Sequence, residues 1–335
     1  MRILVTGATG NIGTSTVEAL ANDPTVDEIV GLARRRPEWA PPKTRFVADD
    51  IRSADLVGLC RDVDAVVHLA WAFQPTHRPK TTWDVNVLGG MRMHEAAAEA
   101  GVRNVVVASS VAAYAPGPGR QVDEQWPTHS MPVAAYGREK AYMERYLDAF
   151  EARNDTIRLV RIRPSFVFKR ESASEQRRIF AGPLVPRPLT RPGRLPILFV
   201  PAGLRFQAVH SSDVGEAIRL AVVGSQRGPF NIAADPVIDR SVLGEIFGSR
   251  TVELPAWPVQ MLHDAAWRLR VVPAEAGLLQ LLLNLPTLNT ARAREELGWD
   301  PRHSGIDALR EMLNGLADGA GMATAPLAPD RASTR

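Results

Sequence analysis

A serine, a tyrosine and a lysine have the spacing expected of a site that transfers a proton. Ser110 is the last residue of the segment 107–110, which ends a predicted strand, and Tyr136 and Lys140 stand four residues apart, on one face of a predicted helix. A cation held close to a phenol favours the phenolate and lowers the pKa of the phenol from about 10. We therefore expect Tyr136 to exchange a proton with a substrate alcohol or carbonyl while Ser110 hydrogen-bonds the same oxygen.

Three glycines at the start of the chain predict a dinucleotide site. The strand pattern 2–6 leads into Gly7, Gly10 and Gly13, spaced G-x-x-G-x-x-G, and a helical pattern follows. Gly7 suits a tight turn, Gly10 lets the backbone approach a pyrophosphate, and Gly13 lets the helix lie close to the sheet. The free N–H groups at the start of that helix would face the phosphates, which assigns Thr9, Asn11 and Ile12 to the cofactor as well.

These residues need a scaffold of alternating strands and helices. Apolar runs typical of strands lie at 3–6, 28–33, 44–48, 65–69, 104–109 and 157–163. Helical patterns separate them, notably at 86–100 and 136–150. This alternation predicts an α/β fold, a doubly wound parallel sheet of the Rossmann type with helices on both faces.

The character of the sequence changes after Pro164. Residues 169–205 hold eight Lys or Arg, two acids and many prolines, which predicts a basic, loop-rich insertion. We expect residues 1–168 to form the dinucleotide-binding domain, with 206–235 returning to it through a strand at 206–210. Residues 169–205 and 236–315 would form a smaller, mainly helical substrate-binding part, and 316–335 a disordered tail.

Composition narrows the function classes. Forty Lys and Arg against 37 acids leave a net charge of +3, too small to favour nucleic acid as a partner. A single cysteine, Cys60, excludes an internal disulfide and a thiolate metal cluster and suits a reducing compartment. No apolar run reaches the roughly 18 residues of a membrane helix. We expect a cytoplasmic protein with a small-molecule substrate, no metal and no membrane partner.

The order of these motifs resembles the short-chain dehydrogenase/reductase superfamily, and within it the extended branch, the NAD(P)-dependent epimerase/dehydratase family. The resemblance covers about residues 1–305 and is carried by residues 6–13, 49–51, 67–70, 86–87, 109–110, 136 with 140, 209–214, 230–232 and 297–299.

The resemblance implies further cofactor contacts. Asp50 and Ile51 match the pair that meets the adenine, and Leu69 and Ala70 match a strand end beside the nicotinamide ribose. The remaining matches are to residues near the nicotinamide or its ribose: Asn86, Tyr136, Lys140, Pro164 and Ser165. His68, His210 and Asp213 match structural positions.

The segment after the second strand favours NADP, with NAD as the alternative. Members of the family specific for NAD place an acid at the position that Ala33 occupies here. Arg34 and Arg35 follow it and can clamp a 2′-phosphate.

The departures from the family pattern favour an oxidoreductase acting on a secondary alcohol or carbonyl of a small or partly apolar substrate. Val111 and Ala112 replace the acid pair of sugar-nucleotide dehydratases, and Phe206 stands where a diphosphate-binding arginine is expected. A nucleotide-sugar 4-epimerase with a retained cofactor is the alternative, and a noncatalytic NADP(H) sensor is an alternative of another class. A homodimer through the helices following Asn86 and Tyr136 is also expected.

Overall fold

The computed structural model describes residues 1–74, 76–181 and 190–329. Its central element is a seven-stranded sheet in the order β11-β7-β5-β4-β1-β2-β3, with every neighbouring pair parallel. The strands are β1 (Arg2–Thr6), β2 (Glu28–Ala33), β3 (Thr44–Ala48), β4 (Ala65–His68), β5 (Asn104–Ala108), β7 (Arg158–Pro164) and β11 (Gly228–Ile232). The predicted doubly wound α/β sheet is confirmed.

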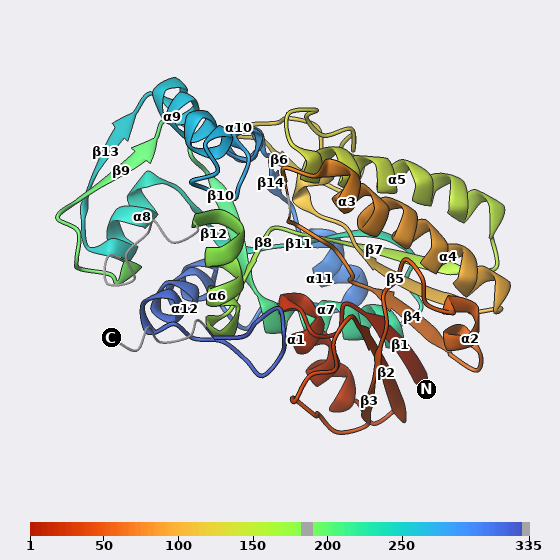
Figure 1. Ribbon diagram of the computed structural model, residues 1–335. Coiled ribbons are helices and arrows are strands. Elements are labelled where there is room, and N and C mark those ends of the chain that lie inside the picture. Colours follow the sequence, from red (N-terminus) through yellow and green to blue (C-terminus); the bar gives the residue numbers. More distant parts are fainter. Residues whose placement is uncertain (75, 182–189, 330–335) are drawn as a thin grey trace.

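Helices cover both faces of this sheet, as Figure 1 shows. On one face lie α1 (Asn11–Ala21), α7 (Ser211–Val223) and α11 (Ala291–Leu297). On the other lie α2 (Leu56–Cys60), α4 (Gly89–Glu99) and α5 (Ala135–Arg153). Two apolar clusters fill the spaces between these helices and the sheet, so the strand ends that carry the candidate site are held from both sides.

The predicted helix 86–100 begins earlier than expected. The chain forms α3 (Pro79–Trp83), then a wider π turn, η1 (Asp84–Leu88), and then α4 without a break. Pro79 opens the first turn, where a missing N–H costs nothing. The π turn places Asn86 on the inner side, where it is buried.

A smaller part stands beside the carboxyl ends of the strands (Figure 1). A second sheet contains β8 (Phe166–Phe168), β10 (Phe206–His210) and β12 (Ala234–Ile238), and a third pairs β9 (Ile197–Pro201) with β13 (Arg250–Leu254). Around them are α6 (Ala173–Gln176), α8 (Arg240–Phe247), α9 (Ala256–Arg268), α10 (Ala276–Asn284) and α12 (Gly305–Asp318). The remaining short elements are β6 (Gln121–Val122), β14 (Thr287–Leu288), η2 (Val111–Ala113), η3 (Arg170–Ser172) and η4 (Arg177–Ala181).

The expectation that residues 206–210 return to the main sheet is wrong. Strand β10 pairs with β8 and β12 in the second sheet, and only α7 and β11 rejoin the large one. The physical reason lies in Phe168 and Ala208, which pack with α8 and α12 in an apolar cluster separate from those of the main sheet.

The expectation of a disordered tail from residue 316 is also wrong for the described residues. Helix α12 extends to Asp318, and the chain then returns across the molecule to the turn before α1. Leu327 is fully buried there, and the Thr324 hydroxyl donates to the Thr9 carbonyl oxygen at 2.9 Å. These contacts offset the conformational entropy lost when the segment becomes ordered. The polar composition alone had suggested that this loss would keep the segment disordered. Residues 330–335 lie outside the described residues.

Within residues 1–74, 76–181 and 190–329, no helix has both the length and the apolarity to cross a membrane.

Candidate active site

The turn after β1 has the close backbone contacts that glycine allows. Gly7 has φ +69°, and a Cβ there would lie 2.7 Å from the Ala70 nitrogen. A Cβ on Gly13 would overlap the Gly7 carbonyl oxygen. The two glycines therefore let α1 and the chain after β4 pack directly against the turn, as the spacing predicted.

A groove of about 170 Å³ runs along this edge of the sheet. It contains nine of the residues assigned to the cofactor from the sequence: Gly7, Thr9, Gly10, Arg34, Arg35, Asp50, Ile51, Leu69 and Ala70. The others assigned to it do not line this groove: Asn11, Ile12, Asn86, Tyr136, Lys140, Pro164 and Ser165.

The start of α1, at this groove, suits a phosphate group. Gly10 is the N-cap of α1 and supplies no side-chain acceptor, so the N–H groups of the first turn are free of a capping side chain. Such N–H groups and the helix dipole attract phosphate. Arg52 holds the pKa of Asp50, which the resemblance assigned to the adenine, at about 2 through a paired hydrogen bond, so this carboxylate is ionised.

The serine and tyrosine predicted to do chemistry are brought together. Ser110 follows β5, is buried, and caps η2 by accepting from the Ala112 N–H at 3.1 Å. Tyr136, in the first turn of α5, lies beside Ser110, whose hydroxyl acts to lower the pKa of the phenol. Because the core fixes β5 and the start of α5, the hydroxyls of Ser110 and Tyr136 lie near each other at the carboxyl edge of the sheet.

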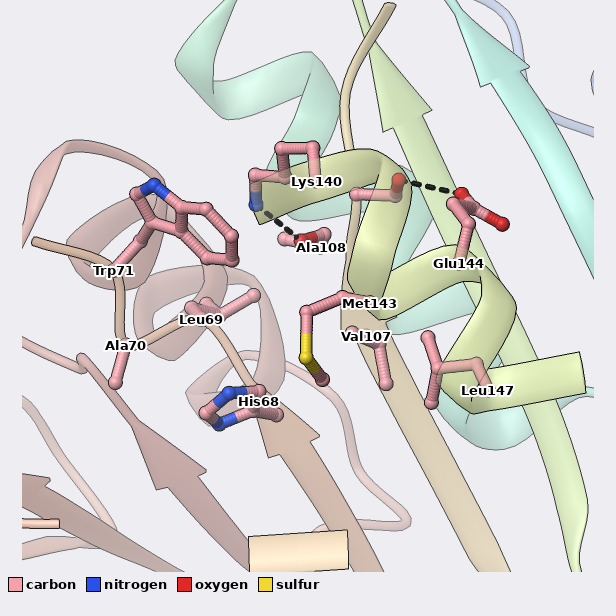
Figure 2. A pocket seen from close by; sticks show the side chains of 11 residues that line it. His68, Leu69, Ala70, Trp71, Val107, Ala108, Lys140, Met143, Glu144 and Leu147 are labelled. Carbon is pink, nitrogen blue, oxygen red and sulfur yellow. Dashed lines mark hydrogen bonds between the residues drawn. The ribbon is translucent and has the colours of Figure 1, made fainter. Parts of the chain in front are cut away.

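The lysine adopts a different arrangement from the predicted one. Lys140 is buried, its ammonium donates to the Ala108 carbonyl oxygen at 2.9 Å, and it lies 3.4 Å from the centre of the Trp71 ring (Figure 2). Its distance to the centre of the Tyr136 ring is 5.9 Å.

The expected lowering of the tyrosine pKa by the lysine is therefore not found. Burial raises the pKa of Tyr136, and the nearby hydroxyl of Ser110 opposes this shift. Burial lowers the pKa of Lys140 to about 7, against the opposing charges of Glu144 and Glu139. In this low-dielectric site, the loss of solvation by Tyr136 and Lys140 outweighs the attraction between a phenolate and an ammonium.

A buried polar brace, which sequence reasoning missed in part, fixes the loop that carries Trp71. The Asn86 amide donates to Glu139 at 2.6 Å and to the Ala72 carbonyl at 2.8 Å, and accepts from the Ala72 N–H at 2.6 Å. Thr82 donates to the other oxygen of Glu139. Asn86 therefore positions the loop after β4 instead of lining the groove. The one sequence feature that could have pointed to Glu139 as a site residue is its position directly before Lys140.

A second buried carboxylate, Glu144, organises the floor of the site. It accepts from Ser109 at 2.5 Å and forms ion pairs with Arg161 at 3.1 Å and Arg163 at 2.8 Å. These partners hold the pKa of Glu144 down to about 2 although burial opposes it. The network ties α5 to β5 and β7, and no sequence spacing revealed it because its members come from separate elements.

Two histidines and an aspartate were assigned to structure. His68 lies in β4, contacts the Thr6 hydroxyl at 2.7 Å, and has its pKa lowered to about 3 mainly by burial. His210 caps α7, and Asp213 accepts from the His303 and Arg302 N–H groups. All three side chains thus make contacts that join elements of the fold or cap a helix. No group of metal-ligating side chains occurs among the described residues.

Two parts of the groove wall were not predicted from the sequence. Ala325 and Pro326 of the returning C-terminal segment form part of its wall, and so does Glu175 of α6. Burial raises the pKa of Glu175 from 4.5 to about 7, although Arg178 and Lys169 oppose the shift. A segment remote in sequence and a carboxyl group therefore border the site where phosphates would bind.

The parallel sheet, the glycine turn and the groove at its carboxyl edge define a dinucleotide-binding protein of the Rossmann class. The model of the NAD dependent epimerase/dehydratase family matches residues 3–233. The chain belongs to this family, in the extended branch of the short-chain dehydrogenases/reductases.

Individual proteins resemble the chain over different lengths. An uncharacterised protein of Mycobacterium tuberculosis (strain ATCC 25618 / H37Rv) is 25% identical over 327 residues, 93% of this chain and 83% of that protein. A UDP-glucose 4-epimerase of Mycolicibacterium smegmatis is 35% identical over 164 residues, 45% of this chain and 51% of that enzyme. The structure of MoeE5 with UDP-glucuronic acid and NAD covers 94% of this chain and 98% of its own at 24% identity, with a TM-score of 0.69.

Proposed function

We propose that the protein is a nicotinamide-dependent enzyme that interconverts a secondary alcohol and a carbonyl, with Tyr136 exchanging the proton on the substrate oxygen. The observation that carries the proposal is the Ser110–Tyr136 pair, held by β5 and α5 at the sheet edge where the groove runs. When bound, the nicotinamide supplies or accepts the hydride.

Three side chains would donate the proton, orient the substrate oxygen and resupply the proton. The raised pKa of Tyr136 keeps its phenol protonated near neutral pH, so it can donate to a developing alkoxide. Ser110 orients the oxygen. Lys140, whose pKa of about 7 leaves both protonation states populated near neutral pH, is the next titrating group on the same helix face and can replenish the proton.

The relatives favour an epimerase outcome. Named proteins similar to the chain include UDP-glucose 4-epimerases. An epimerase requires that hydride be removed and returned within one cycle by a cofactor that stays bound. We therefore place retained-cofactor 4-epimerisation ahead of the one-way oxidoreductase that the sequence motifs favoured, and both use the same hydride step.

For the cofactor, we propose NADP on the side chains at the tip of β2. Ala33 provides no carboxylate to repel a 2′-phosphate, and Arg34 and Arg35 line the groove there. NAD is the alternative, supported by family membership and by the NAD named in the MoeE5 structure.

The test compares Tyr136→Phe with Tyr146→Phe, the same change on the same helix at a tyrosine bonded to Glu95. Hydride transfer from isotopically labelled reduced cofactor is followed with sugar and ketone substrates, together with net cofactor turnover. We expect Tyr136→Phe to lower the rate at least a hundredfold with cofactor affinity retained, and Tyr146→Phe to leave the rate near that of the wild type. An unchanged rate in Tyr136→Phe would refute the proposal. Product without net cofactor oxidation identifies the epimerase, and stoichiometric oxidation the dehydrogenase.

A further inference from the structure

A cavity of about 330 Å³ lies in the smaller part of the molecule, between β8, β10, α10 and α12. Within the part of the chain that the structure describes, eight of its eleven lining side chains are apolar, among them Phe166, Phe206, Leu282, Leu309 and Met312. Its volume falls in the range of small-molecule sites, about 300–1,000 Å³.

An aromatic path connects this cavity to the proton donor. The ring of Phe180, which lines the cavity, lies 5.2 Å from the ring of Phe73, and Phe73 lies 4.8 Å from the ring of Tyr136. Phe166 of the cavity wall and Tyr136 also pack against the same apolar cluster. One aromatic side chain, Phe73, therefore separates Tyr136 from the ring of Phe180 in the cavity wall.

The chemistry of the wall decides what fits there. Of the described residues in the lining, Arg177 is the one with an ionisable side chain, and Gln176 and Thr190 are polar and uncharged. A diphosphate taken out of water needs several paired cations or N–H donors. Phe206 instead presents a ring on β10, 5.3 Å from the ring of Phe166. The wall suits a group that gains from leaving water.

We propose that the substrate carries an apolar group, an alkyl, isoprenoid or aromatic moiety, which occupies this cavity while its alcohol or carbonyl meets Tyr136. The inference rests on the proposed hydride chemistry for the position of the reacting oxygen. It assigns substrate selection to Met312, Leu309 and Phe206. It holds for either outcome, because an epimerase or a dehydrogenase can act on a polar ring attached to an apolar tail.

The test measures binding separately from turnover. Prodan, a neutral naphthyl ketone whose emission shifts in apolar surroundings, is titrated into the full-length protein and displaced with methyl ketones of increasing chain length and with UDP. The variants are Met312→Trp, which fills the cavity, Asn314→Trp, the same residue introduced on the exposed face of α12, and Tyr136→Phe. Circular dichroism confirms that each variant is folded, and Leu309→Phe replaces Met312→Trp if the latter is not.

The inference predicts that methyl ketones displace prodan with an affinity that rises about fourfold per methylene until the cavity is full. Met312→Trp should weaken prodan binding at least tenfold, whereas Asn314→Trp binds as the wild type does. Affinity independent of chain length, or displacement by UDP in preference to ketones with Met312→Trp unchanged, would overturn it. Failure of the proposed function would look different: hydride transfer would survive in Tyr136→Phe while prodan binding followed the cavity variants.

Discussion

At the residue scale, burial decides the ionisation of the groups that border the candidate site. Lys140 has its pKa lowered to about 7, whereas Glu175 has its pKa raised to about 7, and the main cause in both is loss of solvation. Each group is thus poised to change charge near neutral pH. Glu144, in contrast, keeps its charge because two arginines and a serine satisfy it.

Glu175 makes stability depend on pH. Its pKa in the folded state is above the unfolded value, so the folded protein binds more protons between about pH 4.5 and 7, and the free energy of unfolding falls as pH rises through that range. Because the side chain is only partly buried, we expect the loss to reach about 2 kcal/mol by pH 8. Glu175→Gln should remove this slope in urea unfolding curves measured from pH 5 to 8. A slope identical to that of the wild type would show that Glu175 stays ionised throughout.

Arg34 and Arg35 should set the choice of cofactor. Both line the groove at the end of β2, and a guanidinium pairs with a 2′-phosphate through charge-assisted hydrogen bonds. We expect the wild type to bind NADPH at least tenfold more tightly than NADH in fluorescence titrations. The double variant Arg34→Ala, Arg35→Ala should lose this preference with NADH affinity unchanged. Arg36→Ala, which removes the next arginine outside the groove, is the matched control, and equal affinities in the wild type would contradict the prediction.

At the scale of elements, the sequence predicted the large sheet well because its signals are local. Buried parallel strands are apolar runs, and the runs at 28–33 and 44–48 coincide with β2 and β3. The apolar run at 206–210 was recognised as a strand, but such a run carries no information about which sheet it joins. Which sheet this strand joins depends on its packing with Phe168 and α12, which are distant from it in sequence.

The candidate site was predictable to the extent that its residues are adjacent in sequence. The glycine turn and the Ser110–Tyr136 pair follow from motifs and spacing. Other features of the site depend on contacts between segments distant in sequence, so periodicity and spacing could not reveal them. They are the packing of Trp71 on Lys140, the hydrogen bonds of Glu139 and the groove wall at Pro326. The position of Lys140 was misjudged because helix spacing fixes its Cβ and leaves the long side chain free to find the Ala108 carbonyl.

The C-terminal segment 319–329 should slow the exchange of cofactor. Thr324 bonds the Thr9 carbonyl, Ser174 donates to the Leu327 carbonyl at 3.3 Å, and Ala325 and Pro326 line the groove. A truncation after Gly319 should raise the dissociation rate of NADPH at least tenfold in stopped-flow measurements, because the wall of the groove is lost. A truncation after Pro329 leaves the segment in place and serves as the control. Equal release rates in the two truncated proteins would exclude a retaining role.

At the scale of the whole molecule, two of the exposed apolar surfaces among the described residues bear on association with another chain. One lies beside α4 and α5, where Leu88 is 46% and Tyr142 45% exposed. The other is α9, which has no buried residue and exposes Trp257 and Leu262. Exposed apolar patches commonly mark contacts with other molecules. The alanines of α4 do not contribute to the first surface, since Ala96 and Ala97 are buried against the sheet.

We expect the first of these surfaces to form a homodimer, because the Tyr142 ring is already fixed 4.8 Å from the ring of Trp83 and so loses little entropy on association. Leu88→Asp combined with Tyr142→Glu would place two unpaired charges in the contact and should raise the dimer dissociation constant at least a hundredfold. Light scattering coupled to gel filtration would then report the monomer mass of 36.6 kDa. The control, Trp257→Ser with Leu262→Ser on α9, should leave the dimer intact. A dimer lost in the control and kept in the first variant would move the interface to α9, and a monomeric wild type would refute the homodimer.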